Sequence, residues 1–237
     1  MRQILLVLCS MVLFGSCGRV TGSFAIEPPA EGSLRYLALG DSYTIGEGVS
    51  APERWPVQLA GLLRQRGIAV GEPQIIARTG WTVSELSSGI DAAAPRGPFD
   101  LVTLLIGVND QYRGADPEAY RPAFARMLAR AIALAGGDAR RVVVLSIPDW
   151  GATPFARASR RDPARVSAEI DRFNAVNRQE ALAAKVTFVD VTPVSRRAAT
   201  GPSLLAPDGL HYAGPMYGEW ARLALDAAAD ALSVPRQ

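Results

Sequence analysis

Five short apolar segments, separated by longer segments of helical character, constrain the fold of this chain more than any other feature of its sequence. The apolar segments cover residues 35–39, 74–77, 101–106, 141–147 and 186–189, and they are expected to form buried strands. The helix-compatible segments cover residues 55–66, 82–90, 117–135, 163–184 and 214–232. Strands that alternate with helices predict an α/β fold, a three-layer α/β/α sandwich around a parallel sheet, because parallel neighbours need crossover connections.

Two of the expected helices begin with the same dipeptide, Asp116-Pro117 and Asp162-Pro163. An aspartate at the N-cap can accept a hydrogen bond from the first turn. Proline fits the position after it, where the backbone N–H has no helical partner. The sequence therefore predicts capped helix starts at both places.

Polar segments follow the expected strands where the ligand sites of parallel α/β sheets form, beyond the carboxyl ends of the strands. The segments are Gly40-Asp41-Ser42-Tyr43 after the first strand, Arg78-Thr79-Gly80-Trp81 after the second, Gly107-Val108-Asn109-Asp110 after the third, and Asp208-Gly209-Leu210-His211 after the last.

In this order and at these places, the four segments resemble the blocks of the GDSL hydrolases, also called SGNH hydrolases. The resemblance extends over residues 35–232. It implies a five-stranded parallel sheet in the flavodoxin-like order 2-1-3-4-5, which puts the first strand between the second and the third. It also implies a carboxylic ester hydrolase that works through an acyl-enzyme and needs no cofactor.

The resemblance assigns the nucleophile to Ser42, the general base to His211 and the orienting acid to Asp208. A serine hydroxyl needs a base to remove its proton, and an imidazole does this near neutral pH. His211 is the single histidine of the chain. Asp208 lies three residues earlier, so that one turn would bring its carboxylate to the imidazole. His211 is followed by Tyr212, where many family members have proline, and the local loop shape is therefore in question.

The resemblance also implies an oxyanion hole with three donors, the backbone N–H groups of Ser42 and Gly80 and the side-chain amide of Asn109. Such donors stabilise the charge that develops on the carbonyl oxygen. Asp41 and Asp110 suit structural roles in their turns. The aromatic residues that follow strand ends either line the substrate pocket or pack in the core, and the sequence does not decide which; they are Trp81, Tyr112, Trp150 and Phe155.

Other chemistries lack the residues they need. Both cysteines, Cys9 and Cys17, lie near the N-terminus, so that the remaining chain has no thiol nucleophile and neither a metal nor a cofactor is expected. The G-x-S-x-G elbow of the general α/β-hydrolase fold is excluded because Thr44 stands two residues after Ser42. Gly46-Glu47-Gly48 does not continue into a phosphate-binding loop. A net charge of +2 gives no reason to expect nucleic acid as a partner.

The N-terminus has the layout of a secretory signal, with Arg2, an apolar run at residues 4–14 and the small residues around Cys17. Three outcomes are open: lipidation at Cys17, which is favoured, ordinary signal cleavage, or an uncleaved anchor. The expected organisation is a signal at residues 1–17, a flexible tether at 18–33 and the hydrolase domain at 34–237. The protein is then exported, as a periplasmic or outer-membrane-anchored lipoprotein.

The expected function is hydrolysis of a small-molecule carboxylic ester. Short-chain acyl esters, lysophospholipids and acetylated sugars all remain candidate substrates, and the preference between esters and thioesters is open. The alternative is a non-catalytic ligand-binding lipoprotein on the same scaffold. The sequence does not indicate an oligomeric state.

Overall fold

The central element of the fold is a parallel β-sheet. A computed structural model describes residues 33–235, and the predicted signal, most of the predicted tether and Cys17 lie outside them. The sheet contains β1 (Tyr36–Gly40), β2 (Gln74–Ala77), β3 (Leu101–Leu105), β4 (Val142–Leu145) and β5 (Thr187–Val189). All neighbours pair in parallel, in the order β2-β1-β3-β4-β5. The predicted fold class and strand order are confirmed.

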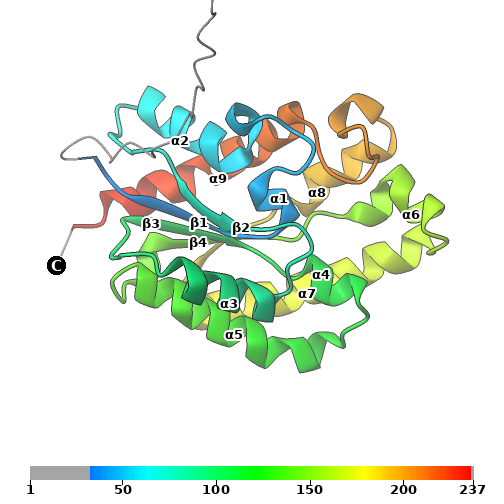
Figure 1. Ribbon diagram of the computed structural model, residues 1–237, viewed down its shortest axis with the longest axis horizontal. Coiled ribbons are helices and arrows are strands. Elements are labelled where there is room, and N and C mark those ends of the chain that lie inside the picture. The colour runs from blue at the N-terminus through cyan, green and yellow to red at the C-terminus, as the bar shows by residue number, and fades with distance from the viewer. Residues whose placement is uncertain (1–32, 236–237) are drawn as a thin grey trace, which may run out of the picture.

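Long helices cover both faces of the sheet, as Figure 1 shows. One face carries α2 (Trp55–Gln65) and α9 (Gly214–Ser233), and the other carries α3 (Val83–Ala93), α5 (Pro117–Leu134) and α7 (Pro163–Ala183). Their bounds differ from the predicted ones by at most three residues. Among residues 33–235, no helix combines the length and the hydrophobicity needed to span a bilayer.

Short helices in the connections were not predicted. They are α1 (Ser42–Ile45), α4 (Val108–Tyr112), α6 (Pro154–Ala158) and α8 (Thr192–Ser195), together with the 3₁₀ helices η1 (Ala51–Glu53), η2 (Ala139–Arg141), η3 (Trp150–Ala152), η4 (Arg196–Ala199) and η5 (Pro202–Leu204). Each has at most five residues, too few for a helical period to be visible in the sequence.

The two aspartate-proline helix starts form as predicted. Asp116 accepts hydrogen bonds from the backbone N–H groups of Glu118 (2.9 Å) and Ala119 (3.0 Å) at the start of α5. Asp162 accepts from the N–H of Ala164 (3.0 Å) at the start of α7. In each case the aspartate satisfies donors that the helix itself leaves unpaired.

Strand register brings three of the polar segments to one place. Gly40, the last residue of β1, pairs with Ala77 of β2 on one side and with Leu105 of β3 on the other. The loops after these three strands therefore begin side by side. A Cβ at Gly40 would lie 2.2 Å from the Thr44 hydroxyl and 2.5 Å from the Leu105 carbonyl oxygen, so that only glycine fits there.

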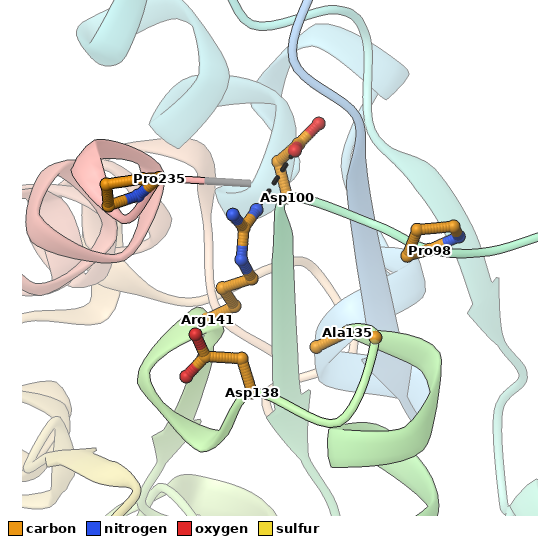
Figure 2. Close-up of a pocket in the computed structure, with 7 residues that line it drawn as sticks. Pro98, Asp100, Ala135, Asp138, Arg141 and Pro235 are labelled. Carbon is orange, nitrogen blue, oxygen red and sulfur yellow. Dashed lines mark hydrogen bonds and ion pairs between the residues drawn. The ribbon is translucent and has the colours of Figure 1, made fainter. Parts of the chain in front are cut away.

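The amino ends of the strands, opposite these loops, are joined by a buried ion pair and its hydrogen bonds. A buried ion pair joins Arg141 to Asp100 at 3.0 Å, next to the starts of β4 and β3 (Figure 2). Asp100 also accepts from the backbone N–H of Arg35, and Arg141 donates to the carbonyl of Val234. These bonds fasten Val234, which directly follows α9, to the amino ends of the strands.

Candidate active site

A cavity of about 220 Å³ opens at the carboxyl ends of the strands. Four of the residues predicted from the sequence line it, namely Ser42, Gly80, Asn109 and His211. The fifth, Asp208, is hydrogen-bonded to His211. The structure thus brings together all five residues named for catalysis and oxyanion binding, from four separate parts of the chain.

Ser42 is the first residue of α1, directly after the turn that ends β1. Asp41 is the N-cap, and its Oδ1 accepts from the backbone N–H of Tyr43 at 3.0 Å. No acceptor in residues 33–235 takes the N–H of Ser42, as expected at the start of a helix. The turn thus places Ser42 in the lining of the cavity.

His211 and Asp208 belong to the loop between η5 and α9. Oδ2 of Asp208 lies 2.6 Å from Nδ1 of His211, while Oδ1 accepts from the backbone N–H groups of Leu210 and His211, both at 2.9 Å. Burial opposes ionisation of Asp208, but the bonds from His211 and the two backbone groups outweigh it and lower its pKa. The carboxylate is thus held charged against the imidazole.

The ring of His211 packs against Tyr43. The two ring centroids are 5.6 Å apart in an edge-on arrangement, and Tyr43 itself is buried. Among the hydrogen bonds of residues 33–235, none joins His211 to Ser42 Oγ. Catalytic hydrogen bonds often shorten only when substrate is bound.

Gly80 and Asn109 lie in the loops after β2 and β3. Gly80 has φ +86°, in a region that favours glycine, and its N–H has no acceptor in the described part of the chain. Asn109 is the second residue of α4, and its Nδ2 donates one hydrogen bond to the carbonyl of Trp81 at 2.9 Å. An amide nitrogen carries two hydrogens, so that the second remains for a ligand.

Asp41 is fully buried beside the nucleophile. Burial raises its pKa to about 8, against the opposing effect of the N–H of Tyr43. Its second oxygen, Oδ2, has no hydrogen-bond partner among residues 33–235, which agrees with a carboxyl group held neutral. As predicted, Asp41 organises the turn; it makes no contact with His211 of the kind that Asp208 makes.

The raised pKa of Asp41 predicts an unusual dependence of stability on pH. Between the ordinary value of 3.8 and about 8, the folded chain keeps a proton that the unfolded chain has lost. The free energy of unfolding therefore falls as the pH rises through this window, by at most about 1.4 kcal/mol per pH unit from this group. Asp41→Asn, which keeps the acceptor for Tyr43, should reduce this slope.

Thermal unfolding of both proteins at pH 5 and pH 8 tests this expectation. The melting temperature of Asp41→Asn relative to the unchanged protein should be higher at pH 8 than at pH 5, because the unchanged protein loses stability between these two values and the variant does not. Parallel pH profiles for the two proteins would show that Asp41 is already charged in the folded state.

Three of the four aromatic residues left open by the sequence line the cavity, and one does not. Tyr112, Trp150 and Phe155 form one wall with ring centroids 5.5 to 6.5 Å apart. Trp81 instead packs on Gly89 of α3, where a Cβ would fall about 2.1 Å from the indole ring. The remaining lining residues were not predicted as site residues; they are Tyr43, Thr79, Val108 and Leu210. In the sequence, these four residues are marked only by standing directly next to a predicted site residue.

No group of three or more histidine, cysteine, aspartate or glutamate side chains in residues 33–235 is arranged to hold a metal ion.

Tyr212, at the position where the sequence departs from the expected proline, is buried and donates to the carbonyl of Asp149 at 3.1 Å. It also forms an antiparallel bridge with Leu205. These contacts hold the His211 loop without a proline.

Comparison with known proteins assigns the chain to a family. The model of the GDSL-like lipase/acylhydrolase family matches residues 38–217, which is most of the chain. The protein belongs to this family and is a carboxylic ester hydrolase. No curated protein matches its sequence significantly.

Solved structures share the fold at low sequence identity. A lipase/acylhydrolase from Enterococcus faecalis is 17% identical with a TM-score of 0.64, covering 83% of this chain and 95% of that one. The psychrotrophic esterase EstA from Pseudoalteromonas is 16% identical with a TM-score of 0.61, over 81% and 95%. A variant of an acetyl-xylooligosaccharide esterase from Geobacillus is 19% identical with a TM-score of 0.61, over 82% and 94%.

Proposed function

We propose that the protein is a serine esterase that hydrolyses short-chain acyl esters through an acyl-enzyme on Ser42. One observation carries the proposal: the Ser42 hydroxyl, the His211 imidazole and three candidate oxyanion donors surround a single cavity, and Asp208 orients the imidazole. This set of groups is what acyl transfer to a serine needs.

In the first half of the reaction, Nε2 of His211 takes the proton of Ser42 Oγ as that oxygen attacks the ester carbonyl carbon. The carbonyl oxygen becomes an oxyanion and accepts hydrogen bonds from the N–H groups of Ser42 and Gly80 and from Asn109. Asp208 keeps the proton of the neutral imidazole on Nδ1 and stabilises the imidazolium. The C–O bond then breaks, and His211 gives its proton to the leaving alcohol.

In the second half, His211 removes a proton from water, which attacks the acyl carbon. The same donors hold the second oxyanion. The bond to Ser42 Oγ breaks, His211 returns the proton to that oxygen, and the carboxylic acid leaves.

The shape of the cavity favours a small acyl group. Its volume of about 220 Å³ is below the range of about 300–1,000 Å³ typical of sites for drug-sized ligands. Tyr112, Trp150 and Phe155 give it an apolar wall. Short esters, including acetylated sugars, fit this space better than the long chain of a lysophospholipid.

A series of p-nitrophenyl esters from acetate to decanoate tests the proposed function. We expect kcat/KM to be highest for acetate or butyrate and to fall at least about tenfold by decanoate, since a chain that does not fit loses about 1.4 kcal/mol or more of transition-state binding. A maximum at decanoate would contradict the short-acyl assignment. No turnover of any ester or thioester would contradict the esterase and favour the non-catalytic binder.

We also propose that the enzyme is exported and anchored by a lipid on Cys17. The support is the signal-like N-terminus of the sequence, with one cysteine at the end of its apolar run. Expression of the full chain and of Cys17→Ser in a bacterial host tests it. The unchanged chain should fractionate with membranes and the variant with soluble exported protein; equal distribution of the two would contradict lipidation.

A further inference from the structure

The loop that carries Gly80 is held in place from α4, the short helix after β3. Three backbone groups between Gly80 and the first residue of α3 are bonded to side chains at or next to that helix. Nη2 of Arg113 donates to Gly80 O (2.8 Å), Nδ2 of Asn109 donates to Trp81 O (2.9 Å), and Oδ2 of Asp110 accepts from Val83 N (3.0 Å). Asn109 and Asp110 belong to segments already singled out, whereas Arg113 does not.

Gly80 makes fewer hydrogen bonds than its neighbour Trp81, whose N–H also donates to the carbonyl of Arg78 at 3.2 Å. The bond from Arg113 is the only hydrogen bond that Gly80 makes within residues 33–235. Apart from Gly80 and its two chain neighbours, no described residue has an atom within 4 Å of where a Cβ would be, so that packing does not hold this side of the residue. With φ at +86°, glycine also has wide conformational freedom.

Arg113 is itself anchored. Its Nη1 lies 3.2 Å from the carboxylate of Glu85, whose Oε2 accepts from both the N–H and the hydroxyl of Thr82 at 2.8 Å. Glu85 and Thr82 form the capping box at the start of α3. The guanidinium therefore joins the C-terminal end of α4, the start of α3 and the Gly80 carbonyl.

The ion pair between Arg113 and Glu85 contributes little to the free energy of unfolding. The side chains of Arg113 and Glu85 are 53% and 43% exposed, and pairs of this kind contribute about 0–1 kcal/mol. The effect of Arg113 should therefore be found in the geometry of the loop rather than in the stability of the fold.

We propose that Arg113 is a positioning residue for the oxyanion hole: by holding the Gly80 carbonyl it limits rotation about Gly80, so that the adjoining Thr79–Gly80 peptide keeps its N–H toward the reacting carbonyl oxygen. The inference rests on the proposed function, in which Gly80 is one of the donors. Oxyanion donors act at about 2.7–3.1 Å from the oxyanion, and a site misplaced by about 1 Å loses much of its rate.

Arg113→Met removes the guanidinium and keeps the apolar stem. Arg130→Met is its matched control. Arg130 also binds α3 from another helix, with two bonds to Ser87 (3.0 Å to the carbonyl and 2.8 Å to the hydroxyl) and an ion pair with Asp91, but it makes no contact with Gly80. If Arg113 only stabilised the fold, Arg113→Met and Arg130→Met would have the same kcat.

We expect Arg113→Met to lower kcat for p-nitrophenyl butyrate about tenfold, less than the 10²–10³-fold effect of losing a donor outright. KM should change less than about twofold, because the bond to the oxyanion forms only in the transition state. A short alkyl trifluoromethyl ketone, which adds Ser42 Oγ to its carbonyl and so mimics the oxyanion, should bind about tenfold more weakly. Arg113→Lys, which keeps one donor, should recover part of both losses.

The outcomes separate the two proposals. If the unchanged protein hydrolyses no ester, the proposed function fails and this inference fails with it. If it is active and Arg113→Met and Arg130→Met have the same kcat and the same affinity for the ketone, only the positioning role of Arg113 is overturned. Equal small decreases in melting temperature for both variants, with a loss of kcat only in Arg113→Met, would establish it.

Discussion

Ser42→Ala should lower kcat for p-nitrophenyl butyrate by about 10⁵-fold or more while leaving the fold intact. The variant lacks the atom that forms the acyl bond, and loss of a serine nucleophile has effects of this size. The Ser42 hydroxyl makes no hydrogen bond within residues 33–235, so that its removal leaves no buried partner unsatisfied. Steady-state kinetics and thermal unfolding of the variant measure both effects.

Ser88→Ala provides the matched control for this substitution. Ser88 lies on α3 outside the cavity, and within residues 33–235 its hydroxyl donates only to the carbonyl of Ser84. Its kcat should stay within about twofold of the unchanged protein, as expected for a surface substitution. A Ser42→Ala variant that retains a tenth or more of the activity would mean that another group attacks the ester.

Asp208→Asn should lower kcat by about 10⁴-fold. The amide oxygen of asparagine can still accept from the N–H groups of Leu210 and His211, which keeps the turn. Its NH₂ group, however, would face Nδ1 of His211 and favour the tautomer with the proton on Nε2. That tautomer cannot take the proton of Ser42. Measurement of kcat with p-nitrophenyl butyrate near pH 7 gives the size of the loss.

Asp41→Asn is the control for Asp208→Asn, because it tests whether the other nearby aspartate is the catalytic acid. Asp41 neighbours Ser42 in sequence, and burial raises its pKa to about 8, so that it does not carry the charge that an imidazolium needs. We expect this substitution to change kcat by less than about tenfold, since it keeps the acceptor for Tyr43. A large loss for Asp41→Asn with a small one for Asp208→Asn would reverse the assignment of the acid.

The sequence predicts the sheet well for a physical reason. Buried parallel strands are apolar on both faces, and β1, β3 and β4 are buried at every residue. The strand order came from the resemblance of the four polar segments to a family, since local patterns do not say which strands pair. The short helices α1 and α4 were missed because four or five residues carry no period.

The polar residues of the candidate site were predicted from the sequence, whereas several residues that line its walls were not. Ser42, Asn109 and His211 stand out because their chemistry is specific and because they follow strand ends. Val108 and Leu210 line the cavity through the way their loops pack, which no local pattern encodes. The contact of Arg113 with Gly80, 33 residues apart, likewise depends on the pairing of β1 with both β2 and β3.

The most direct measurement of the central claim is the mass of the acyl-enzyme. The protein is mixed with p-nitrophenyl butyrate, quenched in acid within the first turnovers, digested and analysed by mass spectrometry. A serine mechanism predicts a butyryl group on the peptide that contains Ser42, together with a burst of p-nitrophenol equal to the enzyme concentration. Steady hydrolysis with neither a burst nor an adduct, or an adduct on another residue, would contradict Ser42 as the nucleophile.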